Sequence, residues 1–220
     1  RPAYCGISFL DLHLSDVDRR YPASAALLGR GMMFALSGDK GMLSHRLGGG
    51  RVGVYVALRV PEDWPVSCGV DWSSAPAARA ALLDHFHDWS PELRDLLRNC
   101  DDTFVPRQIH ALPVGHSWPR VPGVTLLGDA AHLMSPFAGE GANLAMLDAA
   151  ELGLALVEHG DDIEAALAQY EAALFPRSEA AAAESAAGLD TCFAADAPRG
   201  LVAFFQNVAG QSPGNEKQAP

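Results

Sequence analysis

The residues best suited to chemistry form one stretch that joins an apolar run, a carboxylate, two glycines and a helix start. Residues 124–127 (Val-Thr-Leu-Leu) predict a short buried strand that ends at Gly128 and Asp129. A carboxylate in that position can accept hydrogen bonds from sugar-type hydroxyl groups. The sequence therefore points to a ligand that carries a polyol.

The loop after Asp129 adds features that suit a flat ligand. It contains Pro136, Gly139 and Gly141, and a helix is predicted to begin near Ala142. Because glycine lacks a Cβ atom, the backbone at these positions can come close to a ring. The first turn of a helix presents unpaired N–H groups and a partial positive charge. Together these features favour an electron-accepting ring with a polyol chain.

The same residues resemble a known motif. Gly-Asp-Ala-Ala-His at residues 128–132 precedes Pro-Phe-Ala-Gly-Glu-Gly-Ala-Asn at 136–143 and Asp-Ala at 148–149. This order resembles the second FAD-contact motif of the FAD-dependent aromatic hydroxylases, the class A flavoprotein monooxygenases with the para-hydroxybenzoate hydroxylase fold. Within this family the chain is most similar to the branch that holds the tetracycline-modifying monooxygenases. The alternative is an ordinary strand–loop–helix unit with a capping aspartate.

The resemblance implies an FAD- and NAD(P)H-dependent monooxygenase that hydroxylates an aromatic or polyketide-like small molecule. In that chemistry NAD(P)H reduces the flavin, O2 adds at C4a to give a hydroperoxide, and the distal oxygen passes to the substrate. The protein then supplies no nucleophile, but holds the ring, excludes water and positions the substrate. Two alternatives stay open: a flavoprotein of the same fold with halogenase or reductase chemistry, and a non-catalytic remnant that binds no FAD.

The resemblance also implies roles for individual residues. The aspartate of the motif would hold a hydroxyl of the ribityl chain. The N–H groups at the helix start would face the flavin pyrimidine and stabilise its reduced form by something on the order of 1 kcal/mol. The expected FAD contacts are Gly128, Asp129, Pro136, Gly139, Gly141, Ala142 and Asn143.

Substrate contacts are expected from the same loop and from a sheet that precedes it. By resemblance Pro136 and Phe137 face the substrate side of the ring, and core packing is an equally good interpretation of Phe137. The candidates on the sheet are Tyr55 and Arg46, together with Asp11 and Gly53. Asp11 and Gly53 stand where tetracycline-modifying relatives carry Gln and His, so the chemistry of the pocket differs from theirs.

No metal site is expected. His132 lies inside the motif and could act as a base, but nothing nearby in the sequence completes a catalytic triad or a metal set. A structural role is therefore favoured for His132. The remaining histidines show no spacing typical of metal ligands.

Composition excludes several kinds of partner. Sixteen Lys and Arg residues against 27 Asp and Glu give a net charge of −11, which argues against nucleic acid or an anionic membrane surface. The four cysteines are scattered and form no Cys-x-x-Cys pair, so we expect free thiols in a reducing compartment. No apolar run is long enough to span a bilayer. The expected location is the cytoplasm.

The elements that must position these residues begin with an antiparallel sheet. Strands are predicted over residues 4–14, 32–36, 41–46, 51–60 and 103–112, and residues 15–24 are expected to form a polar loop. Apolar residues alternate along 51–60, which indicates a half-buried strand. By resemblance this sheet is the substrate domain and roofs the flavin.

Helices are predicted in two groups. The first covers residues 74–89 and a segment that begins at Ser90 and Pro91. The second starts with the helix of the motif, which should end at Gly160, and continues with one that begins near Asp162 and is kinked or interrupted by Pro176. An apolar segment at 201–208 follows, and residues 211–220 are expected to be a disordered tail.

These elements predict an α+β or α/β protein. It would combine a substrate-domain sheet, the second FAD-contact motif and C-terminal helices. No Gly-x-Gly-x-x-Gly fingerprint for the FAD pyrophosphate is present, so we expect the C-terminal part of a longer protein, which lacks the N-terminal Rossmann half. That N-terminal FAD-binding part is the expected partner, beside a small aromatic substrate. The predicted divisions are 1–112 (substrate sheet with helices), 113–160 (part of the FAD-binding domain), 161–210 (C-terminal helices) and 211–220 (tail).

Overall fold

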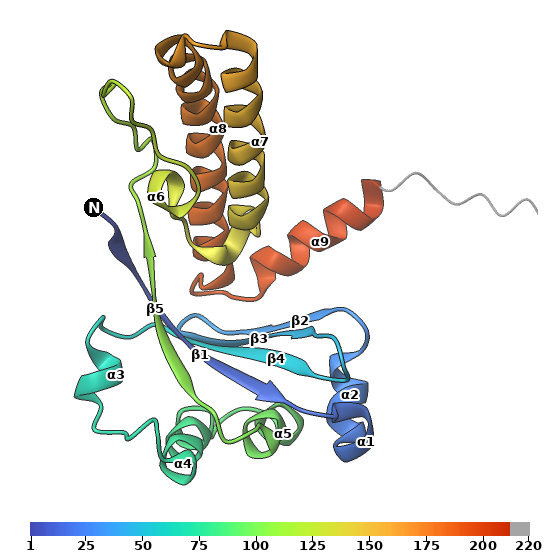
Figure 1. Cartoon of the computed structure of the whole chain (residues 1–220). Helices are drawn as coiled ribbons and strands as arrows, with labels where there is room; N and C mark the ends of the chain where they lie inside the picture. Colours follow the sequence, from blue (N-terminus) through green and yellow to red (C-terminus); the bar gives the residue numbers. More distant parts are fainter. Residues whose placement is uncertain (212–220) are drawn as a thin grey trace, which may run out of the picture.

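The computed structural model describes residues 1–211 and shows an antiparallel sheet with short helices on one face and a helical hairpin on the other (Figure 1). The strands lie in the order β2-β3-β4-β1-β5, and every neighbouring pair is antiparallel. All five predicted strands are confirmed, with small shifts at their ends. They are β1 (Ala3–Leu14), β2 (Met32–Leu36), β3 (Lys40–Arg46), β4 (Val52–Leu58) and β5 (Val105–Ala111).

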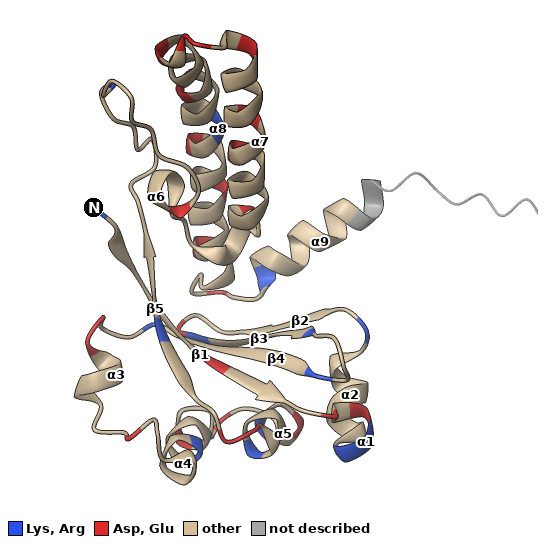
Figure 2. Cartoon of the chain, in the orientation of Figure 1, with Lys and Arg blue, Asp and Glu red and all other residues tan. Residues whose placement is uncertain are grey.

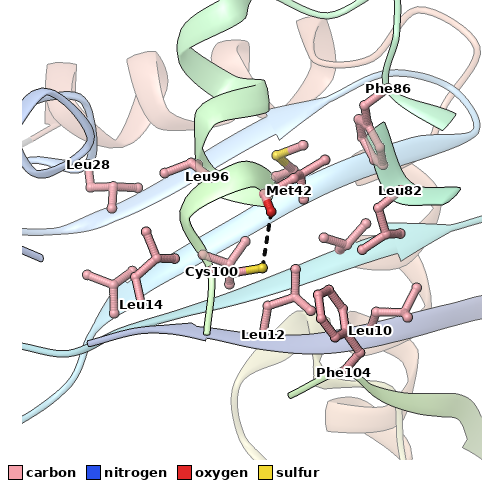
Figure 3. Close-up of a cluster of buried hydrophobic side chains, with 14 of the residues drawn as sticks. Leu10, Leu12, Leu14, Leu28, Met42, Leu82, Phe86, Leu96, Cys100 and Phe104 are labelled. Carbon is pink, nitrogen blue, oxygen red and sulfur yellow. Dashed lines mark hydrogen bonds between the residues drawn. The ribbon is translucent and has the colours of Figure 1, made fainter. Parts of the chain in front are cut away.

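The main core fills the space between the sheet and the short helices (Figure 3). Alternate residues of β1, among them Leu10 and Leu12, face Leu82 and Leu96 from the helices, and all four are fully buried. The helices of this region are α1 (Val17–Arg20), α2 (Pro22–Leu28), α3 (Trp64–Ser67), α4 (Ala75–His85) and α5 (Pro91–Asn99). The other face of the sheet is also covered, and for this reason the prediction that β4 is half-buried is wrong: within the strand only Tyr55 is not buried.

The prediction of a polar loop over residues 15–24 is also wrong. This segment contains α1 and the start of α2, and α1 begins after Asp16, which adopts a left-handed conformation with φ of 52°. Val17 is fully buried, and Ala25 and Leu28 of α2 join the same core. Packing of these few apolar side chains therefore outweighs the polar composition of the segment, as often happens for short helices.

The second group of helices lies beyond β5. It comprises α6 (Asp129–His132), the 3-10 turn η1 (Pro136–Ala138), α7 (Gly141–His159), α8 (Ile163–Cys192) and α9 (Arg199–Gln211). Gly160 ends α7 as predicted, with φ of 59° and its N–H donating to the carbonyl of Leu156. Pro176 does not interrupt α8, because buried residues before and after it, such as Leu174 and Ala181, hold the helix in place.

These helices carry different kinds of surface. Acidic residues occur at several positions along α7 and α8, whereas α9 begins with Arg199 and is otherwise uncharged (Figure 2). The apolar segment predicted at 201–208 lies in α9. The predicted tail lies outside the described residues from residue 212 onward. No helix in the described part of the chain is both long enough and apolar enough to cross a membrane.

The prediction of a buried strand at residues 124–127 is wrong. Its only pairing within the described chain is an isolated bridge between Val121 and Val124, and Val124 and Leu127 are 53% and 43% exposed. No described strand lies beside this segment, so its backbone has no sheet to join. It is held instead by Tyr170 of α8, whose hydroxyl donates to the carbonyl of Leu126 at 3.1 Å.

The predicted domain limits stay predictions. The limit at residue 112 follows the end of β5, and the limit at 160 falls between α7 and α8, which pack against each other as a hairpin.

Candidate functional site

A cavity of about 1630 Å³ lies over the face of the sheet opposite the main core. The sheet, the loop between α6 and α7, and the helices α8 and α9 all contribute to its walls. Every second residue of a strand points to the same face, so adjacent strands present aligned rows of side chains to the cavity. The sheet contributes Phe9, Asp11, Met32, Phe34, Leu43, His45, Tyr55, Arg107, Gln108, Ile109 and His110, and the loop contributes Leu133, Met134, Pro136, Phe137 and Ala138.

Three rings form the floor of the cavity. Tyr55 lies between Phe9 and His45, with ring centroids 5.6 Å and 5.4 Å away and planes tilted by 27° and 25°. Gly53 makes this arrangement possible, because a Cβ atom there would lie 2.9 Å from Cε1 of His45. The imidazole of His45 therefore occupies the space that a side chain at position 53 would fill. Tyr55, predicted as a substrate contact, lies at the centre of this floor.

Phe137 lines the cavity and also packs against other rings, so its place is compatible with both interpretations that the sequence left open. Its ring lines the cavity, and it also makes edge contacts with Phe9 and Phe193 at 5.9 Å and 5.7 Å. These contacts join the loop to the sheet and to the end of α8. The neighbouring Pro136 also lines the cavity, and its contact with FAD and with a substrate stays a prediction.

The polar part of the cavity centres on Asp11. Its side chain is 16% exposed, with Nη2 of Arg107 3.4 Å from Oδ2 and Nε2 of His13 4.0 Å from Oδ1. Arg107 itself is 59% exposed. The floor therefore combines three stacked rings with one largely buried carboxylate.

The segment that carries Gly128 and Asp129 lies next to this cavity along the chain and presents an exposed surface. Asp129 begins α6 and is exposed, and its carboxylate makes no hydrogen bond or ion pair with another described residue. Gly128 is buried at φ of 59°, and Gly139 follows η1 at φ of 71°. Both conformations favour glycine.

The start of α7 is free to bind a polar group. Gly141, Ala142 and Asn143 form its first turn, and the preceding Glu140 provides no side-chain cap. The first N–H groups of a helix have no partner within the helix, so they are available to a ligand in front of it. All seven residues expected to contact FAD thus lie in one continuous segment beside the cavity.

A buried charge network fixes this segment to the helical hairpin. Asp148 is 0% exposed, and its Oδ2 accepts from the backbone N–H of Gly128 at 2.9 Å and lies 2.6 Å from Nε2 of His132. Its Oδ1 accepts from Arg177 at 3.0 Å, and Arg177 also binds Glu151 at 2.6 Å. The structural interpretation of His132 agrees with this geometry, because the imidazole is buried against Asp148.

Residues 119–185, which include the entire segment and its network, match the family described as FAD binding domain. Over part of its length the chain is similar in sequence to FAD-dependent enzymes, among them the FAD-dependent urate hydroxylase of Mycolicibacterium vanbaalenii, at 40% identity over 46% of this chain and 25% of that protein. The chain is also 27% identical over 224 residues to the monooxygenase penA of Penicillium thymicola, an alignment that covers 82% of this chain and 52% of that protein.

Two solved structures share the fold of this chain. The chain is 23% identical in sequence to Klebsiella pneumoniae HpxO, whose structure is solved in complex with FAD and uric acid. The two structures superpose with a TM-score of 0.74 over 96% of this chain and 51% of HpxO. The tetracycline destructase Tet(51) is 18% identical, with a TM-score of 0.59, over 95% and 52% of the two chains. The predicted fold class is confirmed. The chain spans about half the length of these proteins.

Arg46, predicted as a substrate contact, does not line the cavity. Its neighbour His45 faces the cavity, so the alternation along β3 turns Arg46 to the other face of the sheet. There the guanidinium group binds both carboxylate oxygens of Asp18 at 2.7 and 2.9 Å and the carbonyl of Gly29 at 2.8 Å. These contacts give Arg46 a structural role, and Arg107 is the arginine that lines the cavity.

A second acidic anchor was missed by sequence reasoning. Glu171 of α8 is 2% exposed, and its Oε1 accepts from Trp118, Arg120 and Thr125 at 3.1, 3.2 and 2.8 Å. These donors lie in the segment that leads to Gly128. A carboxylate at an otherwise apolar position of a helix was the available signal, at Glu171 as at Asp148, but the partners are not evident from the sequence.

Burial in this region shifts the protonation of two groups. Desolvation raises the pKa of Tyr170, and the nearby negative charge of Asp148 adds to the shift. Burial would lower the pKa of Arg177, but its hydrogen bonds to Glu151 and Asp148 outweigh that effect and the pKa is raised. Tyr170 therefore remains a neutral hydroxyl donor and Arg177 a cation. Within the described residues, no group of three or more His, Cys, Asp or Glu side chains could hold a metal ion.

The contact between α8 and the loop gives a first testable prediction. A Cβ atom at Gly188 would lie 2.9 Å from the backbone oxygen of Phe137, so Gly188→Ala should force the two apart and lower the free energy of unfolding by about 1–3 kcal/mol. Urea denaturation measures this change. Gly153→Ala in α7 is the matched control, because nothing described lies within 4 Å of a Cβ there. If Gly188→Ala is as stable as the control, the close packing of Phe137 on α8 is contradicted.

Proposed function

We propose that this chain forms the substrate side of an FAD- and NAD(P)H-dependent monooxygenase that hydroxylates an aromatic or polyketide-like small molecule. The observation that carries the proposal is the placement of one loop. Pro136 and Phe137 line the cavity over the sheet, and the same loop joins Asp129 to the open start of α7. A cofactor ring held by that segment would face a substrate in the cavity.

The residues present fit an FAD molecule. The free carboxylate of Asp129 would accept a hydrogen bond from a ribityl hydroxyl, and the N–H groups of Gly141, Ala142 and Asn143 would face the polar edge of the ring. When bound, FAD supplies the redox chemistry that passes electrons from NAD(P)H to O2. Two glycines at positive φ, Gly128 and Gly139, shape the backbone on either side.

The chain's own residues would then hold and shield the substrate. The rings of Phe9, Tyr55 and Phe137 provide apolar surface that excludes water from the reacting face. Asp11 and His45 provide the polar groups on the same floor. This division between apolar shielding and a few polar contacts is typical of sites for small molecules.

An N-terminal FAD-binding part is the proposed partner. Residues 124–127 and one face of α7 expose large apolar side chains. The two surfaces are close together, because a Cβ atom at Gly128 would lie 3.4 Å from the Cβ atom of Ala145 in α7. Exposed apolar patches of this kind mark interaction surfaces. The most exposed of these side chains are Val124, Met146, Leu154 and Val157, at 53%, 66%, 69% and 82%. The relatives' additional length supports an occupant within the same protein.

A cytoplasmic location belongs to the same proposal. All four cysteines are free thiols, and Cys100 and Cys192 are buried in the packed core. Widely spaced free cysteines are usual in a reducing compartment.

The proposal is tested by flavin binding. FAD is titrated into the purified chain together with the remainder of the complete protein, and the visible spectrum and flavin fluorescence are recorded. Asp129→Ala is expected to weaken FAD binding by tenfold or more, because a hydrogen bond to a charged group contributes about 1.5–3 kcal/mol. Asp161→Ala removes the same charge from an exposed site at the far end of α7 and should bind FAD as the unaltered chain does.

Two outcomes would contradict parts of this proposal. Unchanged FAD affinity in Asp129→Ala would refute the role of Asp129 alone. A colourless assembly that does not quench added flavin would refute the function and leave an inherited fold without a cofactor.

A further inference from the structure

We propose that Ser135 and Ser185 are positioning residues, which hold Pro136 and Phe137 at a fixed place over the cavity. The two serines join the loop between α6 and α7 to helix α8, and neither is among the described residues that line the cavity. The inference rests on the proposed function for what the loop would contact. The attachment of the loop to α8 is a separate property, which can be measured without a cofactor.

The two serine side chains satisfy each other in the protein interior. Ser135 and Ser185 are 4% and 1% exposed. Their Oγ atoms are 2.6 Å apart, and Oγ of Ser185 donates to the carbonyl of Ser135 at 2.5 Å. The hydroxyl of Ser135 can then donate to Oγ of Ser185 or to its carbonyl, which is 3.2 Å away. Because a buried hydroxyl without a partner is costly, the pair should stay together.

The carbonyl that Ser185 binds lies directly before Pro136. It belongs to the planar peptide group that joins Ser135 to Pro136, so its hydrogen bond fixes the plane from which the proline ring extends. Ser135 is extended, with φ of −64° and ψ of 157°, and the ring of Pro136 restricts the next φ angle. Little rotation remains between α8 and Pro136. The position of this cavity-lining residue therefore follows that of the helix.

Contacts on both sides of the serine pair complete the attachment. Before it, the carbonyl of Leu133 accepts from the backbone N–H of Leu112, just after β5, at 2.8 Å. After it, α8 approaches the loop so closely that a Cβ atom at Gly188 would lie 2.9 Å from the backbone oxygen of Phe137. Packing at Gly188 limits the separation of loop and helix. Hydrogen bonds also fix direction, and the serine pair supplies them between these two points.

Amide hydrogen exchange of the purified chain, without FAD, measures how firmly the loop is held. The reporters are the N–H groups of Leu112 and Gly139, which donate to carbonyl groups of the loop at 2.8 and 3.1 Å. Ser185→Ala removes the donor to the loop carbonyl, and both reporters should exchange about fivefold faster, as the loss of one net hydrogen bond allows. Ser135→Ala keeps that donor, so its effect should be smaller.

A double variant and a matched control separate positioning from general stability. Because the two hydroxyls act as one unit, Ser135→Ala combined with Ser185→Ala should exchange about as fast as Ser185→Ala alone. Ser24→Ala is the control, because Ser24 is also 4% exposed but lies in α2, among the helices on the opposite face of the sheet. Its removal should leave the exchange of both reporters unchanged. Circular dichroism spectra confirm that each variant is folded.

The same variants can be compared in the assembled protein with FAD. Since Pro136 would stand beside the ring, Ser185→Ala should change the visible circular dichroism of the bound flavin, and Ser24→Ala should not. An assembly that binds no FAD would refute the proposed function. The exchange measurement would then still decide whether the serine pair holds the loop.

Several results would overturn the proposal. Unchanged exchange of the reporters in Ser185→Ala would show that the pair does not hold the loop. Exchange in the double variant that equals the product of the two single effects would show two independent contacts. An equal rise in Ser24→Ala would indicate a general loss of stability. Faster exchange with an unaltered signal from bound flavin would show that the pair does not position Pro136 beside the cofactor.

Discussion

Replacement of Asp148 by alanine is expected to lower the free energy of unfolding by roughly 3–5 kcal/mol, because the change leaves buried partners without their counter-charge. Asp148 is 0% exposed and joins the backbone of Gly128, the imidazole of His132 and the guanidinium of Arg177. A typical domain is stable by about 5–15 kcal/mol, so this loss is a large part of the total. Urea denaturation, followed by circular dichroism, measures the change.

A graded pair of variants separates charge from shape at this site. Asp148→Asn keeps the size and one acceptor, so its loss of stability should lie between those of the unaltered chain and Asp148→Ala. Asp190→Ala, at an exposed position of α8, removes the same charge and should change the free energy of unfolding by less than about 0.5 kcal/mol. A loss below about 1 kcal/mol in Asp148→Ala would show that Asp148 does not hold the segment of Gly128 to the hairpin.

The sequence predicted the sheet well because its signals are local. Alternation of apolar residues, as along 51–60, is sufficient to predict a strand. The failures have tertiary causes. Val17 turns a polar segment into part of the core, and residues 124–127 resemble a strand but have no described strand to pair with. The composition of a segment cannot report either circumstance.

The part of the candidate site that depends on local signals was predicted, and the part that depends on tertiary contacts was not. The motif from Gly128 to Asn143 was recognised because its residues are close in sequence and its spacing is specific. Contacts across the sheet depend on the face to which each residue points, and an error of one position reverses that face. Arg46 was therefore proposed in place of its neighbour His45, which lines the cavity. The anchors Asp148 and Glu171 bind partners far away in the chain, and no local pattern predicts those pairs.

Assembly with the remainder of the protein should be abolished, or weakened by at least about 100-fold, when Leu154 and Val157 of α7 are both replaced by glutamate. These side chains are 69% and 82% exposed in this chain, so an N-terminal part that covers them would bury most of both. Burial of one large apolar side chain contributes about 1.5–3 kcal/mol, and a glutamate in the same place would be an unpaired charge in the interface. Analytical ultracentrifugation of the mixed parts measures the loss.

A matched control and the stability of the variant distinguish loss of the interface from a general effect of added charge or from unfolding. Ala168→Glu with Ala172→Glu adds the same charge to exposed positions of α8 and should leave assembly intact. The α7 variant should unfold at the same urea concentration as the unaltered chain, since both side chains already contact water. Unimpaired assembly would show that this face of α7 is not the interface. A chain that self-associates, and becomes monomeric only in the α7 variant, would assign the face to a second copy and refute the N-terminal part as its occupant.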